Sequence, residues 1–249
     1  MASEGGAGPP AGWYGDPNDP TAWRYWDGQA WTEHVAPRIV EPSPQERLAE
    51  ERRWARYAKW AFVGLVPAQI GAQVFGALQS EDRYHGTLFT DEAPTQVSMF
   101  EPAEYALPQL ACAVLVLAMT FVLAYWCMQA ARVAQSQGIP IVRSPGWALA
   151  GWFIPIVNFW FPPQTIRSFA KDRTQLRHVV GWWICWIVAT LSSVAAVFVA
   201  GAQDLDAAIP FLVVGAAGVA SFALLGRQVV DLVLFVHEQG VSELAERSA

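Results

Sequence analysis

Side chains that could carry out acid–base, nucleophilic or metal chemistry are few in this chain, and they do not cluster along it. The four histidines lie in four separate regions: His34, His85, His178 and His237. The three cysteines each lie in an uncharged apolar run: Cys112, Cys127 and Cys185. The chain has no HExxH, GxSxG, P-loop, EF-hand or CxxC motif. We therefore expect no catalytic residue, no metal site, no cofactor and no enzymatic activity.

The most unusual polar residue is Asn158, which lies between proline breaks in the segment FIPIVNFWFPP. Its amide could cap a backbone group freed by Pro155 or Pro162, and we prefer this structural interpretation. The alternative is a substrate contact within the membrane, shared with Trp152 and Pro155, because transporters place binding sites at broken helices.

The elements that position these residues are membrane segments. The chain is 53% apolar and 15% charged, whereas a soluble domain carries about 25% charged residues. Five uncharged runs approach or exceed the roughly 20 residues that a helix needs to cross a bilayer: 61–79, 105–131, 144–166, 179–203 and 207–226. No ionisable side chain falls at the centre of a predicted span, which argues against a proton-coupled pump or an ion relay.

The run 144–166 decides the topology, because four prolines break it and basic residues flank it on both sides. If it does not cross, 15 Lys and Arg lie on the cytoplasmic side and 1 lies outside; if it crosses, the numbers are 9 and 7. Cytoplasmic loops are enriched in Lys and Arg. We therefore predict that both termini are cytoplasmic and that residues 145–166 are re-entrant or interfacial. Full crossing is the alternative.

The predicted fold class is mainly α: a four-helix transmembrane bundle with one proline-broken segment, plus a small N-terminal β-hairpin module. The predicted spans are about 60–79, 105–128, 179–201 and 208–226, within a transmembrane domain over 60–236. The remaining expected parts are a disordered tail (1–11), an aromatic β module (12–34), a linker (35–44), a charged juxtamembrane helix (45–59) and a C-terminal tail (237–249).

The segment 12–34 holds four tryptophans and two tyrosines. Its Asp27-Gly28 pair stands between aromatic runs, which is a strong hairpin signal. A module this small cannot bury all its rings. We expect the exposed rings to contact a protein partner, for example a proline-rich segment, because flat rings suit polyproline. The candidate contact residues are Trp13, Tyr14, Trp23, Tyr25, Trp26 and Trp31.

Lipid is the other expected partner. Four basic residues that follow the broken segment are expected to anchor it to anionic lipids at the cytoplasmic face: Arg167, Lys171, Arg173 and Arg177. The tryptophans at 182, 183 and 186 are expected to form an aromatic belt at the same membrane edge. We expect no nucleic-acid partner.

Small residues recur every four positions in the first predicted span: Gly64, Ala68, Ala72 and Gly76. Such spacing lets helices approach closely in lipid. Packing within one subunit is the preferred interpretation, and a homo-oligomer seam is the alternative.

Two sets of residues match known families. Gly12-Trp13-Tyr14, Asp16-Pro17, the run 24–28 and Trp31-Thr32 resemble a short bacterial module, domain of unknown function 2510. That family usually has proline where this chain has Gly15. The resemblance covers about a tenth of the chain.

The second set is SPGWA at 144–148, GWFIPI at 151–156, Asn158, the Pro162-Pro163-Gln164 run and Trp182-Trp183. These residues resemble the core of domain of unknown function 4328, a multi-pass bacterial family, over roughly residue 54 to the C-terminal region. The resemblance implies a membrane architecture and supplies no reaction, substrate or catalytic residue.

These observations favour a multi-pass protein of the bacterial cell membrane with a cytoplasmic aromatic module. Its expected role is that of a non-enzymatic, membrane-anchored interaction or scaffold protein. The alternative is a small-molecule transporter or channel component with its site at the proline-broken segment.

Overall fold

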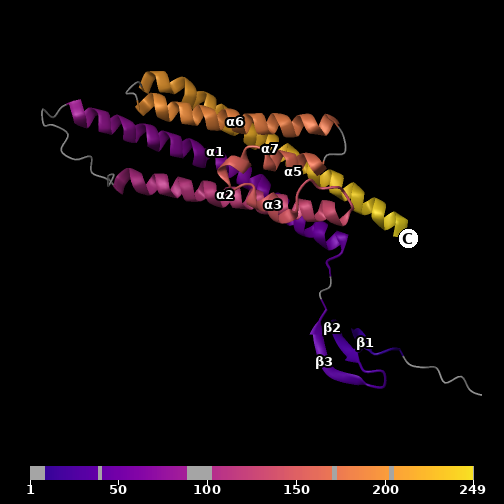
Figure 1. Ribbon diagram of the computed structural model, residues 1–249. Helices are drawn as coiled ribbons and strands as arrows, with labels where there is room; N and C mark the ends of the chain where they lie inside the picture. The colour runs from indigo at the N-terminus through magenta and orange to yellow at the C-terminus, as the bar shows by residue number, and fades with distance from the viewer. Residues whose placement is uncertain (1–8, 39–40, 89–102, 170–172, 202–204, 249) are drawn as a thin grey trace, which may run out of the picture. The chain divides into compact units, whose positions relative to one another are not determined.

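The computed structural model describes residues 9–38, 41–88, 103–169, 173–201 and 205–248. The chain divides into two compact units, Met1–Ser43 and Pro44–Ala249. The first unit is a small antiparallel sheet, and the second unit is helical (Figure 1). The chain as a whole is therefore mainly α, as the sequence predicts.

The sheet of the first unit has three strands in the order β1 (Gly12–Asp16), β2 (Asp19–Trp26) and β3 (Trp31–Pro37). The predicted hairpin is the β2–β3 pair, and Gly28 has the positive φ, +103°, that its turn requires. The connection has four residues between Trp26 and Trp31 rather than two. The Asp27 carboxylate closes it by accepting the backbone N–H groups of Gln29 and Ala30, each at 2.7 Å.

Strand β1 was not predicted, and it makes the module a three-stranded sheet rather than a single hairpin. Its turn to β2 is stabilised by Asp16, whose carboxylate accepts the N–H of Asn18 at 2.9 Å. The same carboxylate pairs with Arg24 across the sheet at 2.8 Å. An Asp-Pro-Asn-Asp sequence is a turn signal of this kind.

The second unit contains four long helices: α1 (Pro44–Leu88), α2 (Ala103–Ser136), α6 (Arg173–Gly201) and α7 (Leu205–Ser248). Helix α1 packs against α2 and α7, and α7 packs along α6. Successive long helices run in opposite directions (Figure 1). Helix α1 is continuous, so the charged segment 45–59 and the apolar residues after it form one helix.

Among the residues that the structure describes, three helices are long and apolar enough to span a membrane: Leu107–Ser136, Arg177–Ala196 and Ala207–Ser248. They contain or overlap the second, third and fourth predicted spans. The first predicted span, 60–79, lies within α1, which is not among the three in the part of the chain that the structure describes. Residues 74 and 76–79 of this stretch are not among those whose side chains the structure describes.

The proline-broken segment forms three short helices, α3 (Pro145–Ala150), α4 (Pro155–Asn158) and α5 (Phe161–Phe169). The longest has nine residues, about 13 Å at 1.5 Å per residue, which is far too short to cross a bilayer. Arg143, just before the segment, donates a hydrogen bond to Gln164 at 2.7 Å and lies over the Phe161 ring. The segment therefore folds back, so that its two flanks meet.

The expected aromatic belt is wrong for Trp182 and Trp183, whose side chains are buried. The Trp182 ring stacks on Phe222 at 5.2 Å and lies edge-on to Phe62. Trp183 contacts the ring of Trp152. These indoles fill the space between the broken segment and the long helices, where the removal of their large apolar surface from solvent stabilises the fold.

One further segment differs from what the sequence predicts. Helix α7 continues to Ser248, where a C-terminal tail is expected, because Val241 packs with Leu48 and Val133 in a small apolar cluster.

In α1, a Cβ added at Gly64 would lie 2.8 Å from Met119 of α2. At this position the small-residue stripe therefore packs within one chain.

Candidate functional site

One face of the N-terminal sheet holds the rings of Tyr14, Trp26 and Trp31, which meet edge to face at 5.2–6.2 Å. The residues just before the sheet lie on this face. The Tyr14 hydroxyl donates a hydrogen bond to the carbonyl oxygen of Pro10 at 2.8 Å. The Trp26 indole N–H donates to the carbonyl oxygen of Pro9 at 3.0 Å. Two residues that were expected in the tail are thus held by two of the predicted contact residues.

The other predicted aromatics lie on the opposite face, because side chains alternate along a strand. Trp13 contacts Tyr25 there, with ring centroids 5.5 Å apart. Trp13 and Trp23 border a shallow hollow next to Ala36, and 49% and 37% of their surfaces are exposed. The six candidate residues therefore form two separate aromatic surfaces rather than one.

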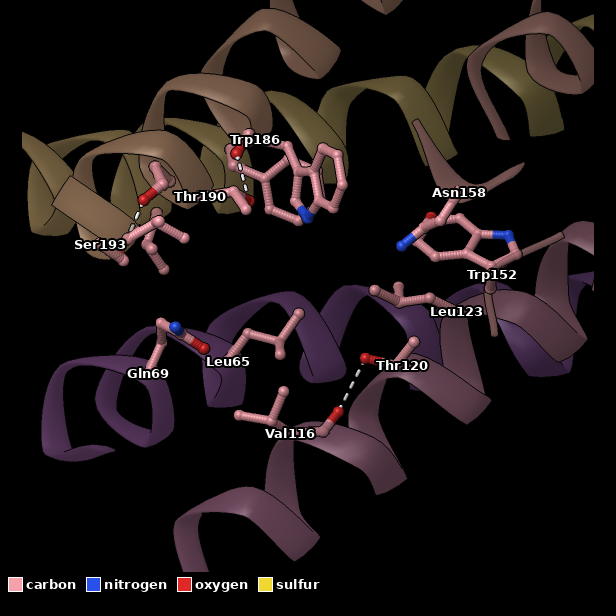
Figure 2. A pocket seen from close by; sticks show the side chains of 14 residues that line it. Leu65, Gln69, Val116, Thr120, Leu123, Trp152, Asn158, Trp186, Thr190 and Ser193 are labelled. Atoms are coloured by element: carbon pink, nitrogen blue, oxygen red, sulfur yellow. Dashed lines mark hydrogen bonds between the residues drawn. The ribbon is translucent and has the colours of Figure 1, made fainter. Parts of the chain in front are cut away.

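In the helical unit, a cavity of about 330 Å³ lies among the four long helices and the broken segment. Figure 2 shows Asn158 and Trp152 near one end of this cavity, and Gln69 and Ser193 near the other. Two of the three residues proposed for a membrane site, Asn158 and Trp152, line it. The third, Pro155, begins α4 and is exposed.

Asn158 does not have the preferred capping role. Its backbone N–H bonds to the carbonyl of Ile154 at 2.8 Å, but its side-chain oxygen is buried and has no hydrogen-bond partner within the described part of the chain. The hydrogen bond that fixes this region comes from α6, where the Trp183 indole donates to the carbonyl of Phe159 at 2.7 Å. The Asn158 side chain therefore lies at the cavity, and its oxygen does not cap a backbone N–H group.

Three hydroxyl groups line the cavity, on Thr120, Thr190 and Ser193. Each donates to the carbonyl oxygen four residues earlier in its own helix, at 2.8–2.9 Å. Their oxygens can still accept hydrogen bonds, and Ser193 accepts one from Gln73 at 2.7 Å. None of the residues found to line the cavity is charged.

The predicted lipid anchor is only partly described. Arg167 on α5 and Arg177 on α6 are exposed. Lys171 lies outside the described residues, and nothing is described of the Arg173 side chain. Among the described residues, no group of three or more His, Cys, Asp or Glu is placed to hold a metal ion.

Sequence reasoning did not assign Pro9, Pro10 or the hydroxyl groups of the cavity to any site. The Pro9-Pro10 pair next to an aromatic module was a usable signal, because aromatic grooves bind proline segments. The cavity hydroxyls gave no signal of their own, since Ser and Thr are ordinary residues of membrane helices.

Residues 11–45 match the family described as Protein of unknown function (DUF2510). Residues 94–235 match the family described as Domain of unknown function (DUF4328). Both resemblances predicted from the sequence are confirmed, in the predicted order, although the second match begins after α1 rather than near residue 54. No curated protein and no solved structure was found to match. Because the second match covers more than half of the sequence, the chain belongs to the DUF4328 family.

Proposed function

We propose that this chain is a non-enzymatic, membrane-anchored interaction protein whose N-terminal sheet binds an extended, proline-containing segment of a partner protein. The observation that carries the proposal is the pair of side-chain hydrogen bonds from Tyr14 and Trp26 to the carbonyls of Pro10 and Pro9. Proline segments offer carbonyl acceptors but no N–H donors, and aromatic grooves recognise them in this way. The chain's own Pro9-Pro10 segment occupies the position that we assign to the partner segment.

The binding surface is the face formed by Tyr14, Trp26 and Trp31. Trp31 lies beside the two donors and is 40% exposed, so it offers further ring surface to a longer segment. A partner segment must displace Pro9-Pro10 from the donors. Because the internal segment is tethered, its effective concentration is in the millimolar range, and its removal should strengthen binding in trans.

The membrane arrangement that we propose has four spans in the bacterial cell membrane, cytoplasmic termini, and a broken segment that enters and leaves on the cytoplasmic side. The contact between Arg143 and Gln164 supports the last part, because it joins the two flanks of that segment. The charge distribution supports the orientation. In this arrangement the exposed Arg167 and Arg177 lie where anionic lipids are found.

The test uses the full chain in lipid nanodiscs and a fluorescein-labelled peptide with two consecutive prolines, measured by fluorescence anisotropy. Deletion of residues 2–10 should tighten peptide binding. Tyr14→Phe and Trp26→Phe in the deletion background should each weaken it about threefold to tenfold, because a net hydrogen bond contributes about 0.5–1.5 kcal/mol. Trp13→Phe on the opposite face is the matched control and should leave the affinity unchanged.

Equal binding of a peptide with alanines in place of both prolines would contradict the proposal. Loss of the sheet in the deletion variant would also contradict it, because Pro9-Pro10 would then be part of the fold rather than a replaceable ligand.

A second candidate function is that of a small-molecule transporter or channel component with its site at Asn158. The cavity among the helices favours it. Solute flux in reconstituted vesicles that is lost in Asn158→Leu would support this role. Flux that is unchanged by the substitution would contradict it.

A further inference from the structure

Beyond the partner surface of the sheet, we propose that the cavity among α1, α2, α6, α7 and the broken segment binds an uncharged, elongated small molecule with a hydrogen-bonding group at each end. The volume of about 330 Å³ is at the lower end of the range for ligand sites. Helices from both halves of the unit line it, together with Trp152 and Asn158. It is therefore a feature of the assembled bundle and not a gap between two neighbouring side chains.

The two ends of the cavity carry side-chain amides. Asn158 and Gln69 line it at opposite ends (Figure 2). The Asn158 oxygen is buried without a partner among the described residues, and an unsatisfied buried polar group costs about 1–3 kcal/mol. A ligand that donates a hydrogen bond to this oxygen would recover that free energy. An amide has both donors and an acceptor, so the ligand group at each end can be a hydroxyl or an amide.

The middle of the cavity is apolar, with Leu65, Val116, Leu123 and Phe222 in its walls. The Trp186 ring lines it near Asn158, and Trp183 and Phe159 hold this ring in place by contacts at 4.5 and 5.4 Å. From Trp186 to Val194 the lining on α6 spans nine residues, a rise of about 12 Å along the helix axis. The walls therefore fit a ligand whose apolar body is at least as long as a single ring.

The ligand must be uncharged. None of the cavity's described lining residues is acidic, basic or a histidine. An ion in such a place would lose its hydration without gaining a counter-charge, which is strongly unfavourable. A lipid acyl chain would suit the walls but would leave the Asn158 oxygen unpaired, so it fits the site less well.

The probe for the test is 1,4-benzenedimethanol, a neutral molecule with a hydroxyl at each end of an apolar ring. Its binding to the full chain in nanodiscs is measured by saturation-transfer NMR titration. Terephthalate has the same outline with two negative charges, and para-xylene has it with no polar end. We expect saturable binding of the diol, weaker binding of para-xylene and none of terephthalate.

Asn158→Leu and Gln69→Leu should each weaken diol binding by tenfold or more. Gln228→Leu is the matched control, because it removes an exposed amide on α7 that lies outside the cavity lining. The Gln69 variant also keeps the test decisive if Asn158→Leu fails to fold.

Three results would overturn the proposal. The diol could show no saturable binding. It could bind equally in the wild type and in the folded Leu variants while para-xylene binds as well as the diol, which would identify a hydrocarbon-filled void. Terephthalate could bind as well as the diol, which would exclude selection for an uncharged ligand.

Discussion

The Nδ1 atom of His237 lies 2.7 Å from a carboxylate oxygen of Glu51, and both side chains are fully buried. This pair joins the first turns of α1 to the second half of α7. Gln137, at the end of α2, adds a hydrogen bond of 2.8 Å to the carbonyl oxygen of His237. Three long helices are thus tied together at the end of the unit that carries the short helices.

The first prediction concerns this buried pair. Glu51→Ala or His237→Ala should lower the free energy of unfolding by about 3–5 kcal/mol, because each leaves a buried polar partner unpaired. The double variant Glu51→Leu/His237→Phe should lose less, since it leaves neither group unpaired. Denaturant titration in micelles measures all three.

The control for this prediction lies one residue away on each helix. Arg52 and Glu238 form an ion pair at 2.9 Å, but both side chains are substantially exposed. Arg52→Ala should therefore cost less than about 1 kcal/mol. Equal losses for Arg52→Ala and Glu51→Ala would show that burial does not distinguish the two pairs.

The second prediction concerns the contact between α6 and α7. A Cβ at Gly218 would lie 3.1 Å from the backbone N and Cα of Ala189. Backbone atoms cannot move away by a rotamer change as a side chain can. Gly218→Ala should therefore push the helices apart and destabilise the unit by about 1–3 kcal/mol. Thermal unfolding of the protein in nanodiscs measures the change.

Gly181 on α6 is the matched position, because a Cβ there would meet nothing within 4 Å. Gly181→Ala should be neutral or stabilise the helix by up to about 1 kcal/mol. If both substitutions destabilise the protein to the same extent, close packing at Gly218 is not the reason.

Local signals in the sequence were sufficient for several elements. The Asp27-Gly28 pair located the β2–β3 connection, because few other residues accept the positive φ found at Gly28. Pro44 is the first residue of α1, and proline is favoured at that position because its fixed φ suits a helix. The four prolines of 144–166 favoured a broken segment over one crossing helix, and the segment forms three short helices.

The features that depend on long-range contacts could not be predicted in this way. The burial of Trp182 depends on Phe62 and Phe222, which come from helices far away in the sequence. The length of α7 depends on Glu51 and Leu48, which lie 186 and 193 residues before their partners His237 and Val241. The cavity likewise exists only once Gln69 and Asn158 are brought to its two ends, so neither residue alone could reveal it.

The third prediction tests which side of the membrane the broken segment reaches. Single cysteines replace Ser144 and Arg167, which are both exposed, in a background with alanine at Cys112, Cys127 and Cys185. Because Arg143 and Gln164 are in contact, we expect both cysteines on the cytoplasmic side. A membrane-impermeant maleimide should label both in permeabilised cells and neither in intact cells.

A cysteine at Arg56, an exposed residue before the first span, provides the reference for the cytoplasmic side, since both the four-span and the five-span arrangements place it there. Labelling of the cysteine at position 167 in intact cells, with protection of the one at 144, would show that the segment crosses. The five-span alternative would then replace the proposed arrangement.

The fourth prediction concerns the acid stability of the N-terminal sheet. The N–H of Asn18 and the neighbouring Arg24 hold the pKa of the Asp16 carboxyl below its ordinary value. Hydrogen bonds from Thr21 lower the pKa of Asp19, and those from Ala30 and Gln29 lower the pKa of Asp27. A carboxylate with a lowered pKa in the folded state stabilises the sheet above its unfolded pKa, and this contribution is lost as the pH falls through the folded value. The sheet should therefore lose stability below about pH 4.

Protein labelled with 5-fluorotryptophan allows this loss to be followed by 19F NMR of the sheet tryptophans in the full chain. Asp16→Asn keeps an acceptor for the Asn18 N–H but removes the charge that pairs with Arg24. This variant should have a less stable sheet than the wild type at pH 7 and a smaller further loss on acidification, so that the two proteins converge once Asp16 is protonated. A variant that is as stable as the wild type at pH 7 and unfolds along the same pH curve would show that Asp16 does not link the sheet to protonation.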